Sequence, residues 1–142
     1  MKQTIAILLV VLAVFFLFAC SGGSTSNLDE NTSKRITPAD ALQGYWEANV
    51  YGITVSYKFS NGSYYTKLAA VVEGQDIDTG FSYAGSYVIN ENDNKIALTL
   101  QEDNSTSYMR YSFENEAITY LATIKPSDGS EGSVLKKVCN LK

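Results

Sequence analysis

The recurrence of turn residues is the feature that most constrains the fold of this chain. From Tyr45 onward, Gly, Asn, Asp and Pro interrupt short runs of Val, Ile, Tyr and Thr about every eight to twelve residues, the spacing of an all-β sandwich or barrel. The connections are too short for crossover helices, so neighbouring strands are expected to pair antiparallel. We predict eight strands, at residues 45–51, 54–60, 63–72, 81–89, 95–101, 107–113, 117–125 and 134–141.

An eight-stranded antiparallel up-and-down barrel is the simplest architecture for these strands. Closure removes the exposed edges that an open sheet would have to protect, and at this strand number the interior is filled by side chains or holds one small ligand. A two-sheet β-sandwich is the alternative. Before the first strand, Thr37–Gly44 is predicted as a short helical turn, because Thr37 can cap it and Pro38 suits its first position. Asn61-Gly62 predicts a type I′ hairpin turn.

The N-terminus predicts an export signal that ends in a lipidation site. Lys2 precedes an unbroken apolar run of 15 residues, 5–19, and Leu17-Phe18-Ala19-Cys20 has the layout of a bacterial lipobox. The run is short of the roughly 20 residues that a transmembrane helix needs. We therefore predict a signal peptide at 1–19, an acylated Cys20 that begins a flexible tether to residue 36, and a folded domain at 37–142.

This anchor predicts a location in the bacterial cell envelope. Acyl chains such as palmitate on Cys20 would hold the protein on a membrane, because more than one buried chain gives stable attachment. Ser21, rather than Asp, follows the cysteine and points to the outer membrane. Acylation would also remove Cys20 from disulfide chemistry, so the sequence predicts no structural disulfide and a buried Cys139 on the last strand.

Composition argues against several classes of function. The whole chain has a net charge of −4, and loss of Lys2 leaves about −5, which disfavours nucleic-acid binding. Histidine, the commonest general base and metal ligand, is absent. The acidic residues lie mostly in turns, and Asp76-Ile77-Asp78 lacks the closing Glu of a calcium loop. We predict a protein that is not an enzyme and needs no metal or cofactor.

Aromatic residues at alternating positions are the candidates for a binding site inside the barrel. On the faces expected to point inward, the alternation places six rings, which fill the core or line a partly open cavity: Tyr57, Phe59, Tyr83, Tyr87, Tyr111 and Phe113. The opposite parity leaves an outward set of Tyr45, Tyr51, Tyr64 or Tyr65, and Tyr108. Clustered exposed tyrosines would favour a contact surface for a protein or a glycan.

The start of the folded part resembles a known family. A helical turn that leads into Leu42-x-Gly44-x-Trp46 at the head of the first strand is similar to the lipocalin and wider calycin pattern, and the whole resembles small lipocalin-like lipoproteins of Bacteroidetes-type bacteria. The resemblance implies that Gly44 and Trp46 form a structural plug at the closed end of the barrel. It also implies a cation from the last strand, Lys136 or Lys137, packed on Trp46.

The expected function is therefore non-catalytic binding at a membrane. A monomeric, lipid-anchored barrel that binds a small hydrophobic or aromatic ligand is the first hypothesis. The alternative is an interaction module of the cell envelope, for assembly, inhibition or surface recognition, with a solid barrel and an outer contact surface.

Overall fold

The computed structural model describes residues 34–139. The predicted signal peptide, Cys20 and nearly all of the tether lie outside this range. The described residues belong to one compact unit. They form one short helix and nine strands: α2 (Pro38–Leu42), β1 (Gly44–Val50), β2 (Ile53–Ser60), β3 (Ser63–Val72), β4 (Gln75–Asp78), β5 (Ser82–Asn90), β6 (Lys95–Leu100), β7 (Thr106–Glu114), β8 (Ala117–Ile124) and β9 (Glu131–Val138).

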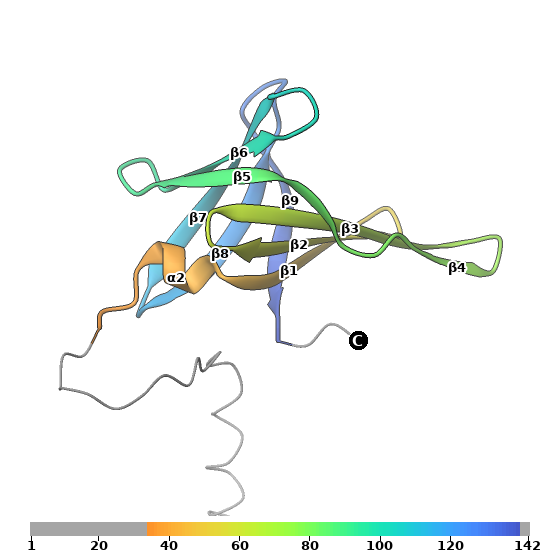
Figure 1. The fold of residues 1–142 in the computed structure, drawn as a ribbon, viewed down its shortest axis with the longest axis horizontal. Coiled ribbons are helices and arrows are strands. Elements are labelled where there is room, and N and C mark those ends of the chain that lie inside the picture. The colour runs from red at the N-terminus through yellow and green to blue at the C-terminus, as the bar shows by residue number, and fades with distance from the viewer. Residues whose placement is uncertain (1–33, 140–142) are drawn as a thin grey trace, which may run out of the picture. The chain divides into compact units, whose positions relative to one another are not determined.

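Eight of the strands close into an antiparallel barrel, as predicted from the turn spacing. Their order is β2-β1-β9-β8-β7-β6-β5-β3, and β3 pairs back with β2 to complete the ring (Figure 1). Each barrel strand therefore pairs with the barrel strands that precede and follow it in the sequence, and the first strand, β1, pairs with the last, β9. The closed ring distinguishes this fold from the two-sheet sandwich.

The helix cap at Thr37 and the hairpin turn at Asn61-Gly62 form as the sequence predicts. Thr37 caps α2, with the Asp40 amide donating to the Thr37 hydroxyl at 3.2 Å and the Thr37 amide donating to the Asp40 carboxylate at 3.1 Å. Asn61 and Gly62 both have positive φ, at 47° and 80°, as a type I′ turn requires.

The segment between β3 and β5 differs from the prediction. Residues 73–80 were expected to form a polar loop, but Glu73 and Gly74 make a tight turn with φ of 51° and 78°, and β4 pairs back along the outer half of β3. The two strands form a hairpin that extends beyond the barrel, at the right of Figure 1, and we call it the arm. The polar sequence Gln-Asp-Ile-Asp hid this strand, because none of its residues is buried.

The last strand also differs, because it begins at Glu131 rather than Val134. A side chain at Gly132 would collide with the Thr123 hydroxyl of β8, which accepts a hydrogen bond from the Ser133 amide at 2.9 Å. A Gly-Ser stretch reads as a loop in the sequence, but here Gly132 permits the close approach of two strands.

The barrel has a closed end and an open end. The turns at 61–62, 91–94 and 115–116 share the closed end with α2, because successive connections of an up-and-down barrel alternate between its ends. The opposite end, which we call the mouth, carries the β1–β2 turn, the arm, and the loops at 101–105 and 125–130. The hydrophobic core lies inside the barrel, nearer the closed end, and includes Leu42, Ile96, Met109 and Leu121.

Candidate functional site

The closed end is plugged by Trp46. This side chain is 2 % exposed, and its indole Nε1 donates to the Leu42 carbonyl of α2 at 2.8 Å. Lys137 of β9 lies over the indole, with Nζ 5.6 Å from the ring centroid, and donates to the Ala41 carbonyl at 2.8 Å. Desolvation lowers the pKa of Lys137. Gly44, with φ of 108°, lets the chain turn from the helix into β1.

Gln43 joins the helix to the hairpins beside it. Its side-chain amide donates to the Tyr87 hydroxyl at 2.8 Å and to the Ala39 carbonyl at 3.0 Å. Its carbonyl oxygen accepts from the Asn61 amide at 3.0 Å. Together with Trp46 and Lys137, this side chain fixes α2 across the closed end, which leaves the mouth as the uncovered end of the barrel.

Most of the six predicted lining residues fill the closed half of the barrel. Phe59 lies at the centre of an aromatic cluster, with ring centroids 6.2 Å from Tyr57, 6.4 Å from Tyr64 and 5.2 Å from Tyr87. Tyr111 and Phe113 belong to the same core or pack against it. Five of the predicted rings therefore face inward, but they form a floor rather than an open cavity.

Tyr83 does not face inward, and this part of the prediction is wrong. Tyr64 pairs with Gly85 while Tyr65 pairs with Tyr83, so the register shifts at Ala84 and reverses the inward and outward parity of β5. Tyr83 is consequently 47 % exposed on the outer surface. A side chain at Gly85 would collide with the Thr99 backbone, and the Tyr64 ring lies near the same space.

The mouth has an inner wall of exposed aliphatic side chains. Ile53, Leu68, Val72 and Ile77 are each between 43 and 49 % exposed. Ile53 pairs with Ala70, and Ala70 pairs with Ile77, so these residues form a row across β2, β3 and β4. We call Ile53, Leu68, Ala70, Val72 and Ile77 the apolar mouth.

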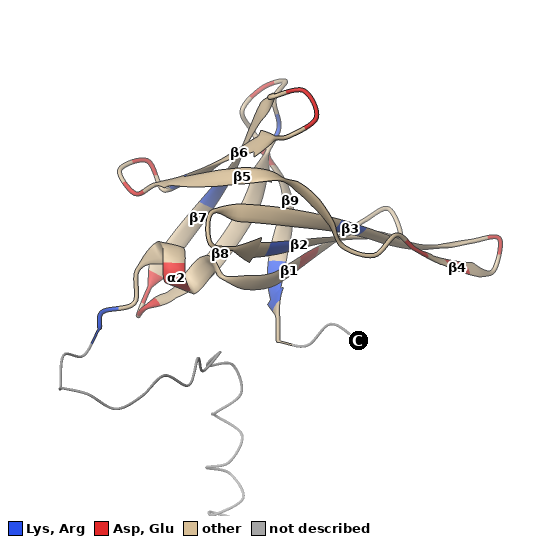
Figure 2. Ribbon diagram, viewed as in Figure 1, with Lys and Arg blue, Asp and Glu red and all other residues tan. Residues whose placement is uncertain are grey.

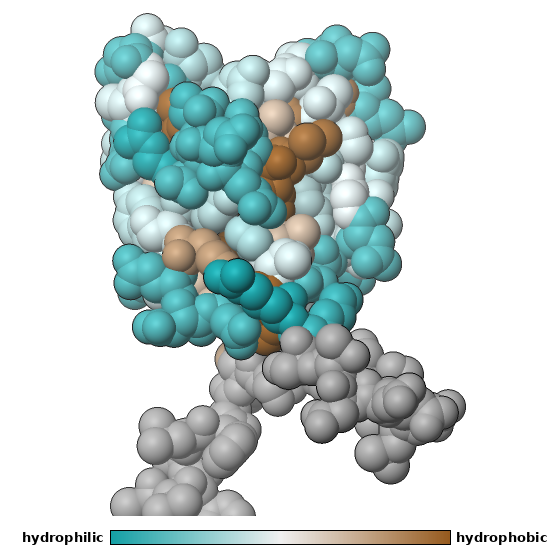
Figure 3. Space-filling model, turned by 90° about the vertical axis from the view of Figure 1, so that its left-hand side faces the viewer, coloured by the Kyte–Doolittle hydropathy of each residue, from teal (hydrophilic) through white to brown (hydrophobic). Residues whose placement is uncertain are grey.

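The apolar mouth is continuous with the barrel interior. Along β2, Ile53 shares its face with Val55 and Tyr57, and these two pair with Ala48 and Trp46, which are buried in the core. Figure 3 shows the opposite side of the molecule, where the surface is mostly hydrophilic or intermediate and hydrophobic areas are narrow. An apolar molecule that enters from the arm therefore meets a continuous apolar wall down to the aromatic floor.

Hydroxyl groups stand where this wall meets the floor. Tyr57 is only partly buried, yet burial raises the pKa of its hydroxyl, and Thr66 pairs with it across β2 and β3. A pocket of about 390 Å³ opens nearby, where β3 and β5 separate, and its lining comprises Thr66, Ser82, Tyr83, Ala84, Leu100, Gln101 and Glu102. These groups could orient the polar end of a bound molecule.

A second candidate surface lies on the outside of the barrel. Tyr45, Lys58, Tyr65 and Tyr83 occupy one register row across β1, β2, β3 and β5, and we call them the tyrosine–lysine row. The Lys58 ammonium lies 5.8 Å from the Tyr45 ring and 5.4 Å from the Tyr65 ring. Tyr65 and Tyr83 meet edge to face at 5.6 Å. Phe81 extends the row, 5.5 Å from Tyr45.

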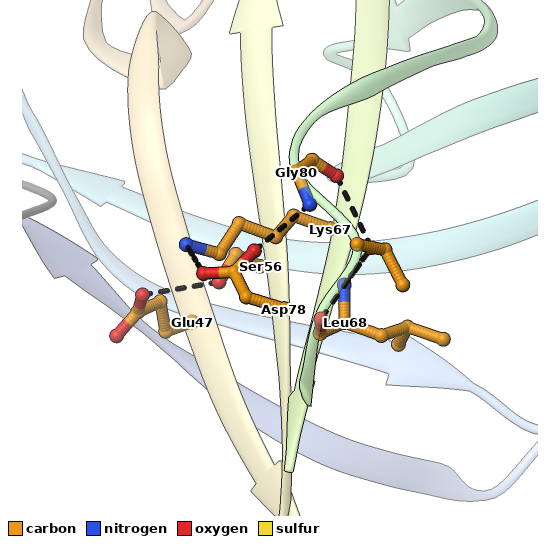
Figure 4. A network of polar contacts seen from close by, with 7 residues as sticks. Glu47, Ser56, Lys67, Leu68, Asp78 and Gly80 are labelled. Atoms are coloured by element: carbon orange, nitrogen blue, oxygen red, sulfur yellow. Dashed lines mark hydrogen bonds and ion pairs between the residues drawn. The ribbon is translucent and has the colours of Figure 1, made fainter. Parts of the chain in front are cut away.

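Polar contacts beside this row hold the base of the arm (Figure 4). Lys67 makes an ion pair with Asp78 at 2.6 Å, and the Gly80 amide donates to the same carboxylate at 2.8 Å. These hydrogen bonds, that to Lys67 first, lower the pKa of Asp78. Ser56 is fully buried beneath them and donates to Glu47 at 3.0 Å.

No group of three or more His, Cys, Asp or Glu residues within 34–139 is arranged to hold a metal ion. Asp78, considered above as part of a calcium loop, is engaged with Lys67 instead. Within the same residues, no helix has the length and hydropathy needed to cross a membrane.

Cys139 corrects the prediction of a buried thiol. It is disulfide-bonded, its partner lies outside the described residues, and it is exposed just beyond the end of β9. The expectation that the chain has no structural disulfide is therefore wrong for this structure. Cys20 itself lies outside the described residues, so its acylation stays a prediction.

Sequence reasoning missed the apolar mouth and found only part of the tyrosine–lysine row, because its outward set included Tyr45 and left Tyr64 and Tyr65 as alternatives. Successive side chains of a strand point to opposite faces, so the predicted strand 63–72 could have grouped Leu68, Ala70 and Val72, but their exposure follows from the unpredicted arm. Lys58 and Tyr65 could be assigned to outer positions, whereas Phe81 and Tyr83 could not, because the bulge at Ala84 leaves no sequence signal.

Comparisons with known proteins add no family to these observations. No protein-family model matches the chain, and no significant match to it was found among curated proteins or solved structures.

Proposed function

We propose that this protein is a lipid-anchored, non-catalytic lipocalin-like barrel that binds a small hydrophobic molecule at its mouth. The apolar mouth carries this proposal. Four large aliphatic side chains of one sheet face are each nearly half exposed, although soluble proteins seldom expose such contiguous apolar patches without a binding role. The filled floor supports a ligand that lies in the mouth rather than deep in the barrel.

The arm accounts for the position of this site. A barrel without it would end where β3 leaves β5, near Thr66 and Ser82. The arm extends the inner face of β2 and β3 by a third strand, so a ligand could contact the aliphatic row while its far end reaches Tyr57. The proposed site is thus a wall and a floor, open on the side of the loops.

A pair of substitutions on one strand tests the proposal. Leu68 and Val71 are both exposed on β3, but they lie on opposite faces of the arm. We expect the mature chain to bind the neutral apolar probe N-phenyl-1-naphthylamine saturably, and Leu68→Ser to weaken binding about tenfold, because the lost contact is on the order of 1.4 kcal/mol. Val71→Ser should leave the dissociation constant unchanged.

The matched design separates specific binding from general stickiness. Equal weakening by both substitutions, or the absence of saturable binding, would contradict a site at the apolar mouth. Thermal unfolding of each variant checks that the barrel itself is unchanged, which we expect because both positions are exposed.

The tyrosine–lysine row favours a second candidate function, contact with a glycan of the cell envelope. The faces of its aromatic rings are negative and suit the weakly positive C–H groups of a sugar, and the phenols and Lys58 supply hydrogen bonds at the ring edges. Co-sedimentation with a purified envelope polysaccharide tests it. We expect Tyr65→Ala to lose binding. Tyr108→Ala, at an exposed position on β7, should keep it. Equal binding by both variants would exclude the tyrosine–lysine row as the glycan site.

A further inference from the structure

The inner wall of the mouth lacks a cation. The described strand residues of this wall include the apolar mouth together with Val50, Val55, Tyr57, Thr66, Gln75, Ser82, Leu100, Ser107, Thr123 and Ser133. Lys137 shares the inner parity of β9, but it lies at the closed end, where it donates to Ala41 and covers Trp46. The strands of the wall therefore offer no partner for a negative charge, but Lys125, in the loop after β8, lines a hollow with Val50 and Ser133 of the wall.

The rim of the mouth is acidic. Glu73 and Asp76 lie on the arm, Glu102 and Asp103 on the 101–105 loop, and Asp128 on the 125–130 loop, all exposed. None of the five makes an ion pair with another described residue. Lys125 is the one basic residue in the described loops of this end. Figure 2 shows acidic residues on the arm and on the loops at the top, and also at the closed end, around α2 and on the hairpin between β5 and β6.

The apolar wall and the acidic rim both disfavour a negatively charged ligand. An anionic headgroup would lose hydration on entering the apolar wall and would then face like charges at the rim. The surroundings of the Tyr64 hydroxyl, inside the barrel, also disfavour negative charge. Burial first, and then Tyr57, Tyr83 and Asp103, raise the pKa of Tyr64, so an added negative charge is disfavoured there.

The strands of the wall carry no cation, and the rim sets five unpaired carboxylates against the single Lys125. From this balance we propose that the mouth selects amphiphiles without a negative charge, whose single aliphatic chain lies on the apolar mouth. This inference rests on the proposed function and narrows its ligand class. A neutral or positively charged headgroup would lie at the rim, where it would meet the exposed carboxylates.

Three probes of equal chain length test the selection. The unacylated mature chain, residues 20–142, is titrated below micellar concentrations at pH 7.5 with decyltrimethylammonium, decanol and decanoate, and binding is followed by calorimetry. We expect the first two to bind at least about tenfold more tightly than decanoate. Salt should narrow the difference between decyltrimethylammonium and decanoate, because the rim charges are exposed to solvent.

Charge variants assign the selection to the rim. Glu73→Gln combined with Glu102→Gln should strengthen decanoate binding about threefold and leave decanol unchanged, whereas Glu91→Gln, at the closed end, should alter neither. Binding of decanoate as tight as that of the other two probes would overturn the inference and leave the proposed function standing. If none of the three binds, both are overturned. Equal effects of the rim and closed-end variants would also overturn the inference.

Discussion

Tyr87 and Tyr111 are two buried tyrosines in the same core whose hydroxyl groups have different surroundings. The Tyr87 hydroxyl accepts a hydrogen bond from Gln43 at 2.8 Å. The buried Tyr111 hydroxyl has no hydrogen-bond partner among the described residues, and burial raises its pKa, followed by a smaller effect of Glu91. A buried polar group without a partner is destabilising, so the two hydroxyls should contribute to stability with opposite signs.

Replacing each tyrosine with phenylalanine measures this difference. We expect Tyr111→Phe to raise the free energy of unfolding by about 1 kcal/mol, because it removes an unsatisfied group without leaving a cavity. Tyr87→Phe should lower it by about 1 kcal/mol, because it leaves the Gln43 amide with one partner fewer. Urea unfolding of both variants gives the comparison. Destabilisation by Tyr111→Phe would instead indicate that a bound water satisfies this hydroxyl.

The arm is the element whose attachment depends most on a single charge. Asp78 joins Lys67 of β3 to the Gly80 amide, and these contacts hold its pKa below the ordinary value of 3.8. A lowered carboxyl pKa contributes stability that is fully present above the unfolded value and is lost as the pH falls through the folded value. The arm should therefore loosen only below about pH 3.8.

Asp78→Asn provides the corresponding experiment. We expect the difference in unfolding free energy between the natural chain and Asp78→Asn to be constant from about pH 5 to 8 and to shrink as the pH falls below 4. Asp76→Asn, on the same strand, serves as the control, because Asp76 makes no ion pair with another described residue. A difference that stays constant down to pH 2 would show that the Asp78 contacts do not fix the arm.

The elements show where sequence patterns suffice. Strand 63–72 was predicted with its observed bounds, because Asn61-Gly62 fixes its start and the polar residues from Glu73 mark its end. β4 was missed because all four of its residues are exposed, and an exposed edge strand has no hydrophobic period to detect. The bulge at Ala84 has no composition signal either, since it depends on contacts between β3 and β5 that are distant in sequence.

At the scale of the whole molecule, the closed barrel followed from turn spacing, but the candidate site did not. The interior positions of Tyr57, Phe59 and Tyr87 follow from alternation along each strand. Their packing into one cluster around Phe59 depends on how β2 and β5 are placed relative to each other in the barrel. The apolar mouth depends on the arm. Whether a residue such as Leu68 is exposed depends on which other parts of the folded chain cover it. The local sequence around the residue does not carry this information.

The bonding state of the two cysteines bears on the predicted attachment of the protein to a membrane. Cys139 is disulfide-bonded with a partner outside the described residues, and the chain contains one other cysteine, Cys20. A thioether-linked lipid on Cys20, as the lipobox predicts, would occupy its sulfur. Acylation of Cys20 and an intrachain bond between the two cysteines therefore exclude each other, and separate substitutions can distinguish them.

Fractionation of cells that express each cysteine variant tests the lipid anchor. We expect the natural chain and Cys139→Ser to remain with the membrane fraction, because both keep an acylated Cys20 and each buried methylene contributes about 0.8 kcal/mol to attachment. Cys20→Ser should appear in the soluble fraction. Mass spectrometry of the N-terminal peptide should show an acylated cysteine in Cys139→Ser as in the natural chain. Retention of Cys20→Ser on the membrane, with an unmodified Cys20 in the natural chain, would refute the anchor and favour the disulfide.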